Sequence, residues 1–222
     1  MQRQELVNSQ PVDSEVIIET RELSRVYPGV VALDNVNYRV YRNKVNVLIG
    51  ENGAGKSTMM KMLAGVETPS SGQIILDGAP VTLSSTHQAE KQGISIIFQE
   101  LNLFPNMNVM DNIFMANEFF QKGKINEKYQ YELAKSLLER LELDVDPYTQ
   151  LGELGIGHQQ LVEIARALSK DTRVLIMDEP TSALSQSEVK ILFNVIEQLK
   201  RRGVTIIYIS HRLEELMEIG DH

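Results

Sequence analysis

The apolar residues of the first hundred positions are spaced mainly as in β-strands. Short apolar runs, some of them alternating with polar residues, predict buried or half-buried strands. These runs lie at residues 16–18, 36–40, 45–49, 74–76 and 94–98. Between the third and fourth runs, Met59, Met62 and Leu63 recur at helical spacing and predict an amphipathic helix. This part of the chain is therefore expected to interleave a β-lobe with a helix.

Helical spacing prevails from about residue 100 to residue 157, where an apolar stripe recurs every three or four positions. The stripe consists of Tyr131, Leu133, Leu137, Leu138 and Leu141. It predicts an inserted helical lobe. The last third then alternates, with strands expected at 174–177 and 205–209 and helices at 159–169, 186–202 and from residue 212. Strands that alternate with helices are typical of a parallel sheet.

The helix expected at 186–202 has the clearest end signals. Ser185 and Glu188 have the spacing of a capping box at its start, and Gly203 provides a stop. We therefore predict that this helix begins directly after Ser185.

The bulk composition narrows the possible functions. A chain of 222 residues with 42% hydrophobic residues can bury one full core, so we expect one compact unit over residues 16–222. The net charge of −8 argues against a nucleic-acid partner, because binding a polyanion requires a basic face that the sequence does not indicate. The absence of cysteine excludes disulfides and thiolate metal sites.

The sequence gives no sign of a membrane-spanning segment. No apolar run approaches the roughly 20 residues that a spanning helix requires. Residues 1–15 are polar where a secretory signal would be apolar, and we expect them to form a flexible tail on a cytosolic protein. Any role at a membrane is expected to depend on a partner.

A complete phosphate-binding motif follows the strand expected at 45–49. Its glycines allow backbone N–H groups to turn inward around phosphates, and the next helix adds the positive end of its dipole. Lys56 is expected to reach the terminal phosphates, and the Ser57 hydroxyl to bind Mg²⁺. The competing interpretation is a strand-to-helix turn with a lysine by coincidence. This nucleotide-binding segment, the phosphate loop, comprises Gly50, Glu51, Asn52, Gly53, Ala54, Gly55, Lys56, Ser57 and Thr58.

Two carboxylates end the strand expected at 174–177, at the edge where parallel sheets bind ligands. Asp178 is expected to hold Mg²⁺, directly or through water, and Glu179 to polarise the water that attacks a γ-phosphate. Gln99 and His211 each follow another expected strand; Gln99 can approach the metal ion and the water, and His211 the γ-phosphate. Taken alone, each of the two is more often structural, and the acidic pair alone is more often solvated.

The order of these motifs resembles that of the ABC ATPase family, and the resemblance covers about residues 16–222. Through it, Tyr27 matches the aromatic residue that stacks on adenine, although a half-buried tyrosine of a β-lobe remains the alternative for that position. The remaining matches are residues 50–58 to the Walker A loop, Gln99 to the Q-loop, 154–160 to the signature motif, Asp178 and Glu179 to Walker B, 182–185 to the D-loop, and His211 to the switch histidine.

The resemblance implies the fold and a partner domain. The expected fold is α/β, a P-loop NTPase core with a parallel sheet, an N-terminal antiparallel β-subdomain, and an inserted α-helical subdomain at about residues 100–157. A second ABC ATPase domain is expected to pair with this one head to tail, with ATP between them. The signature residues expected to face the partner's nucleotide are Leu154, Gly155, Ile156, Gly157 and His158.

Within the family, residues 27–34, 99–103 and 210–213 resemble the importers of ribose, galactose and xylose. This resemblance implies membrane permease subunits, an extracytoplasmic sugar-binding protein, and a peripheral place at the cytoplasmic face of the bacterial inner membrane. Such ATPases usually carry two domains in one polypeptide of about twice this length. We therefore expect this chain to be the first domain and to be cut short at its C-terminus.

Three departures from the family pattern bear on activity. Gly155 stands where the signature has a serine, Ser185 where an aspartate commonly ends the D-loop, and Asn43-Lys44 where a Gly-Glu turn is usual. The signature serine is expected to bond the γ-phosphate on the opposing domain, and a bond to a charged group contributes about 1.5–3 kcal/mol. Its loss is expected to weaken the closed dimer and slow hydrolysis without preventing ATP binding.

Two rival functions remain. One is a soluble ABC ATPase that acts on DNA or ribosomes, which the acidic composition disfavours. The other is a catalytically weak half that binds ATP mainly to build an interface, as Gly155 suggests. The presence of Glu179 and His211 indicates instead that this chain's own phosphate pocket hydrolyses ATP when a partner supplies a good signature.

Overall fold

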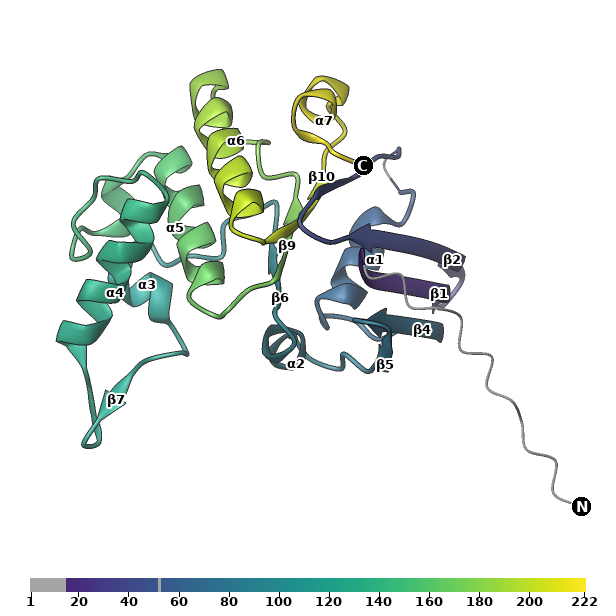
Figure 1. Ribbon diagram of the computed structural model, residues 1–222, viewed down its shortest axis with the longest axis horizontal. Helices are drawn as coiled ribbons and strands as arrows, with labels where there is room; N and C mark the ends of the chain where they lie inside the picture. The colour runs from purple at the N-terminus through teal and green to yellow at the C-terminus, as the bar shows by residue number, and fades with distance from the viewer. Residues whose placement is uncertain (1–14, 52) are drawn as a thin grey trace, which may run out of the picture.

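The computed structural model describes residues 15–51 and 53–222, which form a β-lobe, a central parallel sheet and a helical lobe (Figure 1). The β-lobe is a four-stranded antiparallel sheet with the order β2-β1-β4-β5. Its strands are β1 (Val16–Tyr27), β2 (Val30–Tyr41), β4 (Ser71–Leu76) and β5 (Ala79–Val81). The predicted tail at 1–15 lies outside the described residues except for Glu15.

The central sheet has the order β3-β10-β9-β6, and all its strands are parallel. Its strands are β3 (Val45–Leu48), β10 (Thr205–Ile209), β9 (Val174–Asp178) and β6 (Ile94–Ile97). Every residue of β10 is buried, as expected for a strand that is covered on both faces. The predicted parallel sheet is therefore confirmed.

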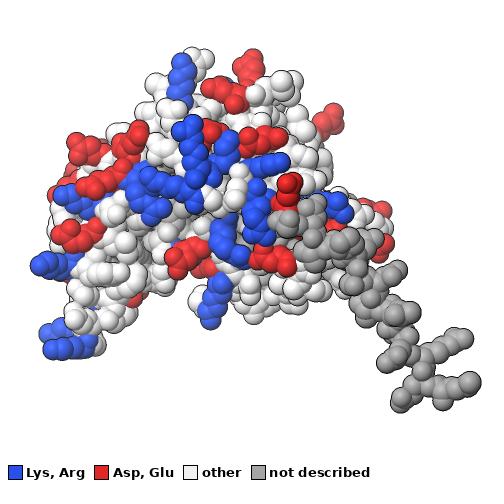
Figure 2. Space-filling model, viewed as in Figure 1, with Lys and Arg blue, Asp and Glu red and all other residues white. Residues whose placement is uncertain are grey.

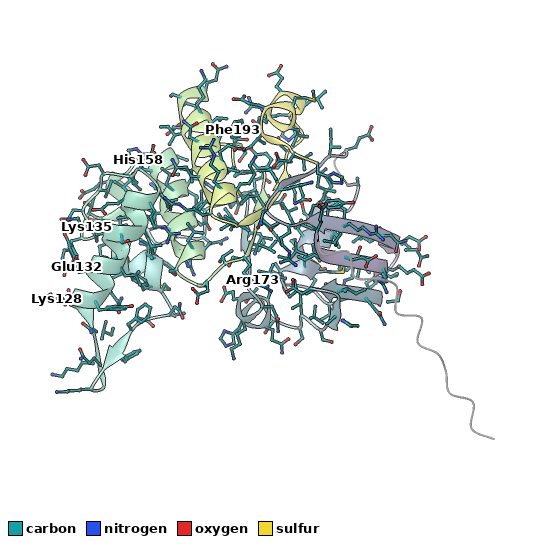
Figure 3. All side chains as sticks on the ribbon, in the orientation of Figure 1. Lys128, Glu132, Lys135, His158, Arg173 and Phe193 are labelled. Atoms are coloured by element: carbon teal, nitrogen blue, oxygen red, sulfur yellow. The ribbon has the colours of Figure 1, made fainter. Side chains whose placement is uncertain are left out.

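Successive residues of β9 and β10 point to opposite faces of the sheet and enter two separate cores. One core joins the sheet to α1 (Lys56–Leu63) and the β-lobe and receives Val174, Ile176, Ile207 and Ile209. The other joins the sheet to α5 (Ile156–Leu168), α6 (Gln186–Arg201) and the helical lobe and receives Leu175, Met177, Ile206 and Tyr208. In that second core, the ring of Phe193, which is labelled in Figure 3, meets the ring of Tyr208 edge to face with the centroids 6.1 Å apart.

The helical lobe lies at the left of Figure 1. It contains α3 (Val109–Phe114), α4 (Glu127–Arg140) and a short 3₁₀ turn (Leu151–Glu153), and it packs against α5. It also carries a two-stranded hairpin of β7 (Phe120–Gln121) and β8 (Lys124–Ile125), which the helical pattern did not predict. The remaining helices are α2 (Thr86–Lys91) and α7 (Leu213–Ile219).

One helix begins clearly earlier than predicted. The helix expected at 159–169 begins at Ile156, so Gly157 and His158 lie inside its first turn. Glycine is a poor helix former, so local propensity alone does not favour a helix that includes Gly157. The capping box at Ser185 and Glu188 is present as predicted.

No helix in the described part of the chain could span a membrane, because each is too short or too polar to cross a bilayer. On the face shown in Figure 2, many Lys and Arg side chains gather near the middle of the molecule, with Asp and Glu side chains around them.

Candidate functional site

The carboxyl ends of the four parallel strands lie level with one another. Leu48 of β3 pairs with Ile209 of β10, Ile209 pairs with Asp178 of β9, and Met177 pairs with Ile97 of β6. The parallel register thus brings several predicted site residues to a single edge of the sheet. One or two positions beyond the paired ends stand Gly50, His211, Glu179 and Gln99.

The phosphate loop connects β3 to α1 at this edge. Gly53 and Gly55 both have φ of +83°, a backbone conformation that favours glycine. A Cβ atom on Gly55 would also lie 2.5 Å from the carbonyl oxygen of Ala32, so β2 packs directly against the loop. Asn52, one of the predicted nucleotide-binding residues, lies outside the described residues. The backbone therefore requires glycine at two positions of the motif.

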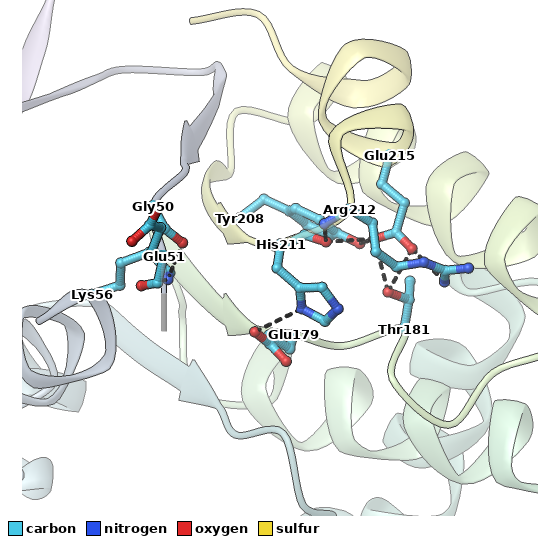
Figure 4. Close-up of polar contacts among 10 residues, drawn as sticks. Gly50, Glu51, Lys56, Glu179, Thr181, Tyr208, His211, Arg212 and Glu215 are labelled. Carbon is cyan, nitrogen blue, oxygen red and sulfur yellow. Dashed lines mark hydrogen bonds and ion pairs between the residues drawn. The ribbon is translucent and has the colours of Figure 1, made fainter. Parts of the chain in front are cut away.

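The Lys56 side chain folds back across the phosphate loop (Figure 4). Its Nζ atom donates hydrogen bonds to the carbonyl oxygens of Gly50 at 2.6 Å and Glu51 at 2.9 Å. The ammonium group therefore lies over the loop at the start of α1, where the helix dipole also favours anions. This places a positive charge beside the backbone N–H groups that the loop can offer to phosphate groups.

Ser57 and Asp178 meet where α1 approaches the end of β9. Burial raises the pKa of the Asp178 carboxyl, and the hydrogen bond from the Ser57 hydroxyl opposes that shift. A hydroxyl and a carboxylate are ligands that fit Mg²⁺, which takes one or two protein oxygens and completes its shell with phosphates and water. No larger cluster of His, Asp or Glu able to hold a metal occurs among residues 15–51 and 53–222. The donor set therefore fits a magnesium ion shared with a nucleotide.

Glu179 and His211 form a direct contact at the same edge (Figure 4). His211 Nδ1 lies 3.1 Å from Glu179 Oε1, and the Glu179 backbone N–H donates to the Ile209 carbonyl at 3.0 Å. Glu179 has φ of +49°, a left-handed conformation that is uncommon outside glycine and often occurs at functional sites. The strained backbone aims the carboxylate toward His211, whose side chain is 58% exposed.

A buried glutamate on α7, Glu215, is hydrogen-bonded to the segments that carry Glu179 and His211. Glu215 is 6% exposed, and its carboxylate accepts hydrogen bonds from the hydroxyls of Thr181, Ser210 and Tyr208 at 2.8–3.1 Å. Arg212 Nη1 lies 2.7 Å from it as an ion pair. Because Thr181 follows β9 and Ser210 follows β10, Glu215 fixes the two segments that carry the catalytic candidates. The sequence analysis missed this residue, although a charge beside Leu216 and Ile219 on an apolar helix face was a usable signal.

Gln99 is exposed in the bend after β6, two residues beyond the Ile97–Met177 pair. The bend is held three residues further on, at Asn102, by two side chains of α5. Glu163 Oε1 accepts from the Asn102 N–H at 3.3 Å, and Arg166 donates to the Asn102 carbonyl at 2.8 Å. The helix that begins at the signature residues therefore also holds the segment after Gln99.

The signature residues lie apart from the phosphate loop of the same chain. They precede or begin α5 in the left half of Figure 3, where His158 is labelled, whereas α1 lies in the right half of Figure 1. Gly155 is the N-cap of α5 without a side-chain hydrogen bond, Ile156 is 44% exposed, and Leu154 is half-buried.

The first turn of α5 is joined to α6 through Glu188. The Gly157 N–H donates to Glu188 Oε1 at 3.0 Å, while Oε2 of the same carboxylate accepts from the Ser185 N–H at 2.8 Å. These bonds lower the pKa of Glu188, the Ser185 hydroxyl contributing most. A Cβ on Gly157 would lie 2.5 Å from Glu188 Oε1, so a larger residue there would displace this carboxylate. The Glu188 carboxylate thereby links the signature residues to the segment 182–185 through hydrogen bonds.

Tyr27 ends β1 in the β-lobe and is half-buried. Its ring lies under the guanidinium of Arg25, and its hydroxyl donates to Glu67. Thr58, the last residue of the phosphate loop, lies in the first turn of α1.

Comparisons with known proteins agree with this architecture. A family model described as "ABC transporter" matches residues 33–182. The xylose import ATP-binding protein XylG of Thermoanaerobacter pseudethanolicus is 50% identical over 210 residues, which are 94% of this chain and 42% of that protein. The ribose import ATP-binding protein RbsA of Rhodopirellula baltica is 47% identical over 211 residues, which are 95% of this chain and 41% of that protein. This chain thus spans less than half the length of either relative.

Solved structures have the same fold. A nucleotide-free ATP-binding cassette from an ABC transporter matches with a TM-score of 0.81 and 27% identity, over 93% of this chain and 85% of that chain. A structure of the ADP conformation of an ATP-binding cassette of an ABC transporter, MJ1267, matches with a TM-score of 0.80 and 27% identity, over 93% of this chain and 85% of that chain. The predicted P-loop core with an antiparallel β-subdomain and a helical subdomain is confirmed.

Proposed function

The chain belongs to the ABC transporter family, and we propose that it is the ATP-binding and ATP-hydrolysing part of a sugar importer. The observation that carries the proposal is the convergence of the phosphate loop, Asp178, Glu179 and His211 at one edge of the sheet. The relatives named as xylose and ribose import ATP-binding proteins support the sugar class. The ordinary substrate of this arrangement is a nucleoside triphosphate.

In this proposal each residue of the edge has one task. The N–H groups of the phosphate loop and the start of α1 bind the β- and γ-phosphates, and Lys56 exchanges its loop carbonyls for phosphate oxygens. Ser57 and Asp178 hold Mg²⁺, with Gln99 close to it. When bound, the metal ion neutralises the charge that develops on the phosphates. Tyr27 stacks on the base.

Hydrolysis in this proposal is an in-line displacement at the γ-phosphorus. Glu179 accepts a proton from the attacking water, the new bond joins the water oxygen to phosphorus, and the bond from phosphorus to the ADP oxygen breaks. His211 holds the Glu179 carboxylate in place through Nδ1 and offers its other ring nitrogen to the γ-phosphate. The products are ADP and inorganic phosphate.

A complete site in this proposal takes two domains. The signature residues lie far from the phosphate loop of the same chain, so Leu154, Gly155, Ile156, Gly157 and His158 serve a nucleotide on a second ABC ATPase domain. Binding of ATP draws the two domains together and hydrolysis separates them. Membrane permease subunits docked near Gln99 and the helical lobe convert this motion into alternating access, with sugar supplied by an extracytoplasmic binding protein. The domain then sits at the cytoplasmic face of the bacterial inner membrane.

The proposal is tested on two levels. Calorimetry of the chain with MgATP is expected to detect binding, and Lys56→Ala is expected to weaken it strongly. Equal affinity in that variant would mean that Lys56 does not contact the nucleotide. Purification in complex with candidate permease subunits, followed by ATPase assays with and without xylose, ribose or galactose, tests the transport role. We expect at least one of these sugars, presented with its binding protein, to stimulate turnover; stimulation by DNA or ribosomes instead would contradict the importer.

A further inference from the structure

The ring of Tyr27 is held by two charged side chains that the family resemblance does not assign. The guanidinium carbon of Arg25 lies 4.7 Å from the ring centroid, over one face of the ring. The Tyr27 hydroxyl donates to the Glu67 carboxylate. Arg25 Nε in turn lies 3.3 Å from Glu67, so the three side chains form a closed set of contacts.

This set connects the β-lobe to the segment that follows α1. Arg25 Nη1 also donates to the Thr68 carbonyl at 2.8 Å, and the Glu67 N–H donates to the Lys61 carbonyl of α1 at 3.2 Å. The Arg25 and Glu67 side chains are only 24% and 21% exposed, so solvent and salt screen their attraction less than on an open surface. The tyrosine is therefore fixed relative to the same helix that carries Lys56 at its start.

We propose that Arg25 and Glu67 are positioning residues for the nucleotide base, holding the Tyr27 ring so that its face away from Arg25 stacks on a purine. The inference rests on the proposed function. An aromatic ring fixed before binding loses less conformational entropy when the base arrives. Arg25 fixes the plane of the ring by covering one face, and Glu67 fixes its far end through the hydroxyl.

The same contacts determine how the base is recognised. The Tyr27 hydroxyl is engaged by Glu67, and the Arg25 guanidinium by Glu67 and Thr68, so these groups are not directed at the edge of a base. Stacking alone tolerates different bases because every base has an aromatic face. The ligand class is therefore a nucleoside triphosphate recognised by the face of its base, and ATP and GTP affinities are expected to lie within about fivefold of each other.

The experiment compares a ligand that has a base with one that lacks it. Calorimetry on the full chain measures the affinity for MgATP and for magnesium tripolyphosphate. Arg25→Ala and Glu67→Ala are each expected to weaken ATP about three- to tenfold, and to leave tripolyphosphate within about twofold. Tyr27→Ala is expected to weaken ATP binding about ten- to a hundredfold and to leave the affinity for tripolyphosphate within about twofold.

Two further variants serve as controls. Arg21→Ala removes an arginine from the same strand, where it pairs with Glu19 at 2.9 Å, and is expected to bind both ligands as the wild type does. Glu67→Gln keeps an oxygen that accepts from Tyr27 and is expected to recover most of the ATP affinity lost in Glu67→Ala. Arg25→Lys keeps the charge without the planar group and replaces Arg25→Ala if the latter does not fold.

The outcomes separate this inference from the proposed function. Equal weakening of ATP and tripolyphosphate would mean that Arg25 and Glu67 act through general stability or charge, which overturns the inference. Unchanged ATP affinity in both alanine variants would overturn it too. If the wild type binds neither ligand, or Lys56→Ala binds both normally, the proposed nucleotide site itself is wrong.

Discussion

The Nδ1 atom of His211 lies 3.1 Å from Oε1 of Glu179, although 32 positions separate the two residues in the sequence. The contact follows from the sheet, because β9 and β10 are parallel neighbours and end level at Asp178 and Ile209. Each residue that follows these ends projects beyond the same edge. The pair is therefore built by strand register rather than by a local motif.

Glu179→Gln is expected to bind ATP with nearly wild-type affinity and to lose hydrolysis by about two to four orders of magnitude, because the amide keeps the shape but cannot accept the proton. The measurement is ATP turnover of the variant within the assembled transporter, with filter binding of ATP as the control for the site. Turnover within twofold of the wild type would mean that another group activates the water.

The sequence predicted the sheet, the β-lobe and the order of the motifs because these depend on local patterns. The run that ends at Asp178 is apolar at every position before the acid, and the glycines of the phosphate loop match their φ values at Gly53 and Gly55. Since parallel strands bring their carboxyl ends together, finding the strands was enough to place Gln99, Glu179 and His211 at one edge.

The supporting residues were not predictable in the same way. Glu215, Glu188 and Glu67 each act through partners distant in the sequence, and their positions depend on how helices pack rather than on periodicity. The start of α5 was also missed, because Gly157 has low helix propensity, yet its N–H is bonded to Glu188 of α6 in the first turn. Tertiary contacts outweighed local preference at these positions.

Glu215→Gln is expected to lower the free energy of unfolding by about 2 kcal/mol, because hydrogen bonds to a buried charged acceptor are among the stronger ones. The carboxylate receives bonds from three hydroxyls and pairs with Arg212, and an amide cannot accept all of them. Urea unfolding provides the measurement. Glu214→Gln, its exposed neighbour on α7, is the matched control, and equal effects of the two substitutions would contradict the role given to Glu215.

Glu163 is expected to make stability depend on pH. Burial raises the pKa of its carboxyl from 4.5 to about 7, opposed by the Asn102 N–H and by Arg166. Between these values the unfolded chain releases a proton that the folded chain keeps. The contribution of Glu163 to the free energy of unfolding therefore falls as pH rises through this window, by about 3 kcal/mol at most.

Glu163→Gln removes that contribution. Relative to the wild type, the variant is expected to gain about 2 to 3 kcal/mol between pH 5 and pH 8 in urea unfolding. Glu132→Gln, an exposed position on α4, is expected to change little over the same range (Figure 3). A difference between wild type and Glu163→Gln that stays constant with pH would mean that Glu163 ionises in the folded protein as it does in water.

Gly155 is the departure from the family pattern that a single substitution can correct. It has φ of −62° and ψ of 156°, and a Cβ there would meet no atom within 4 Å. Serine fits this backbone and is a preferred N-cap, so Gly155→Ser is expected to raise the free energy of unfolding by a few tenths of a kcal/mol. Gly157→Ala is the contrasting control, because its Cβ would lie 2.5 Å from Glu188 Oε1 and is expected to break the hydrogen bond between the Gly157 N–H and that carboxylate.

The larger effect of Gly155→Ser is expected between domains. The new hydroxyl stands at the exposed start of α5, away from the phosphate loop of its own chain, so the ATP affinity of the monomer should not change. A bond from that hydroxyl to the partner's γ-phosphate contributes about 1.5–3 kcal/mol, which corresponds to roughly a ten- to hundredfold tighter ATP-driven association. Sedimentation with ATP compares Glu179→Gln alone with Glu179→Gln plus Gly155→Ser, because blocked hydrolysis preserves the closed pair. An unchanged dimer fraction would show that the hydroxyl does not act across the interface, and a smaller one would show that the backbone at Gly155 requires glycine when the domains close.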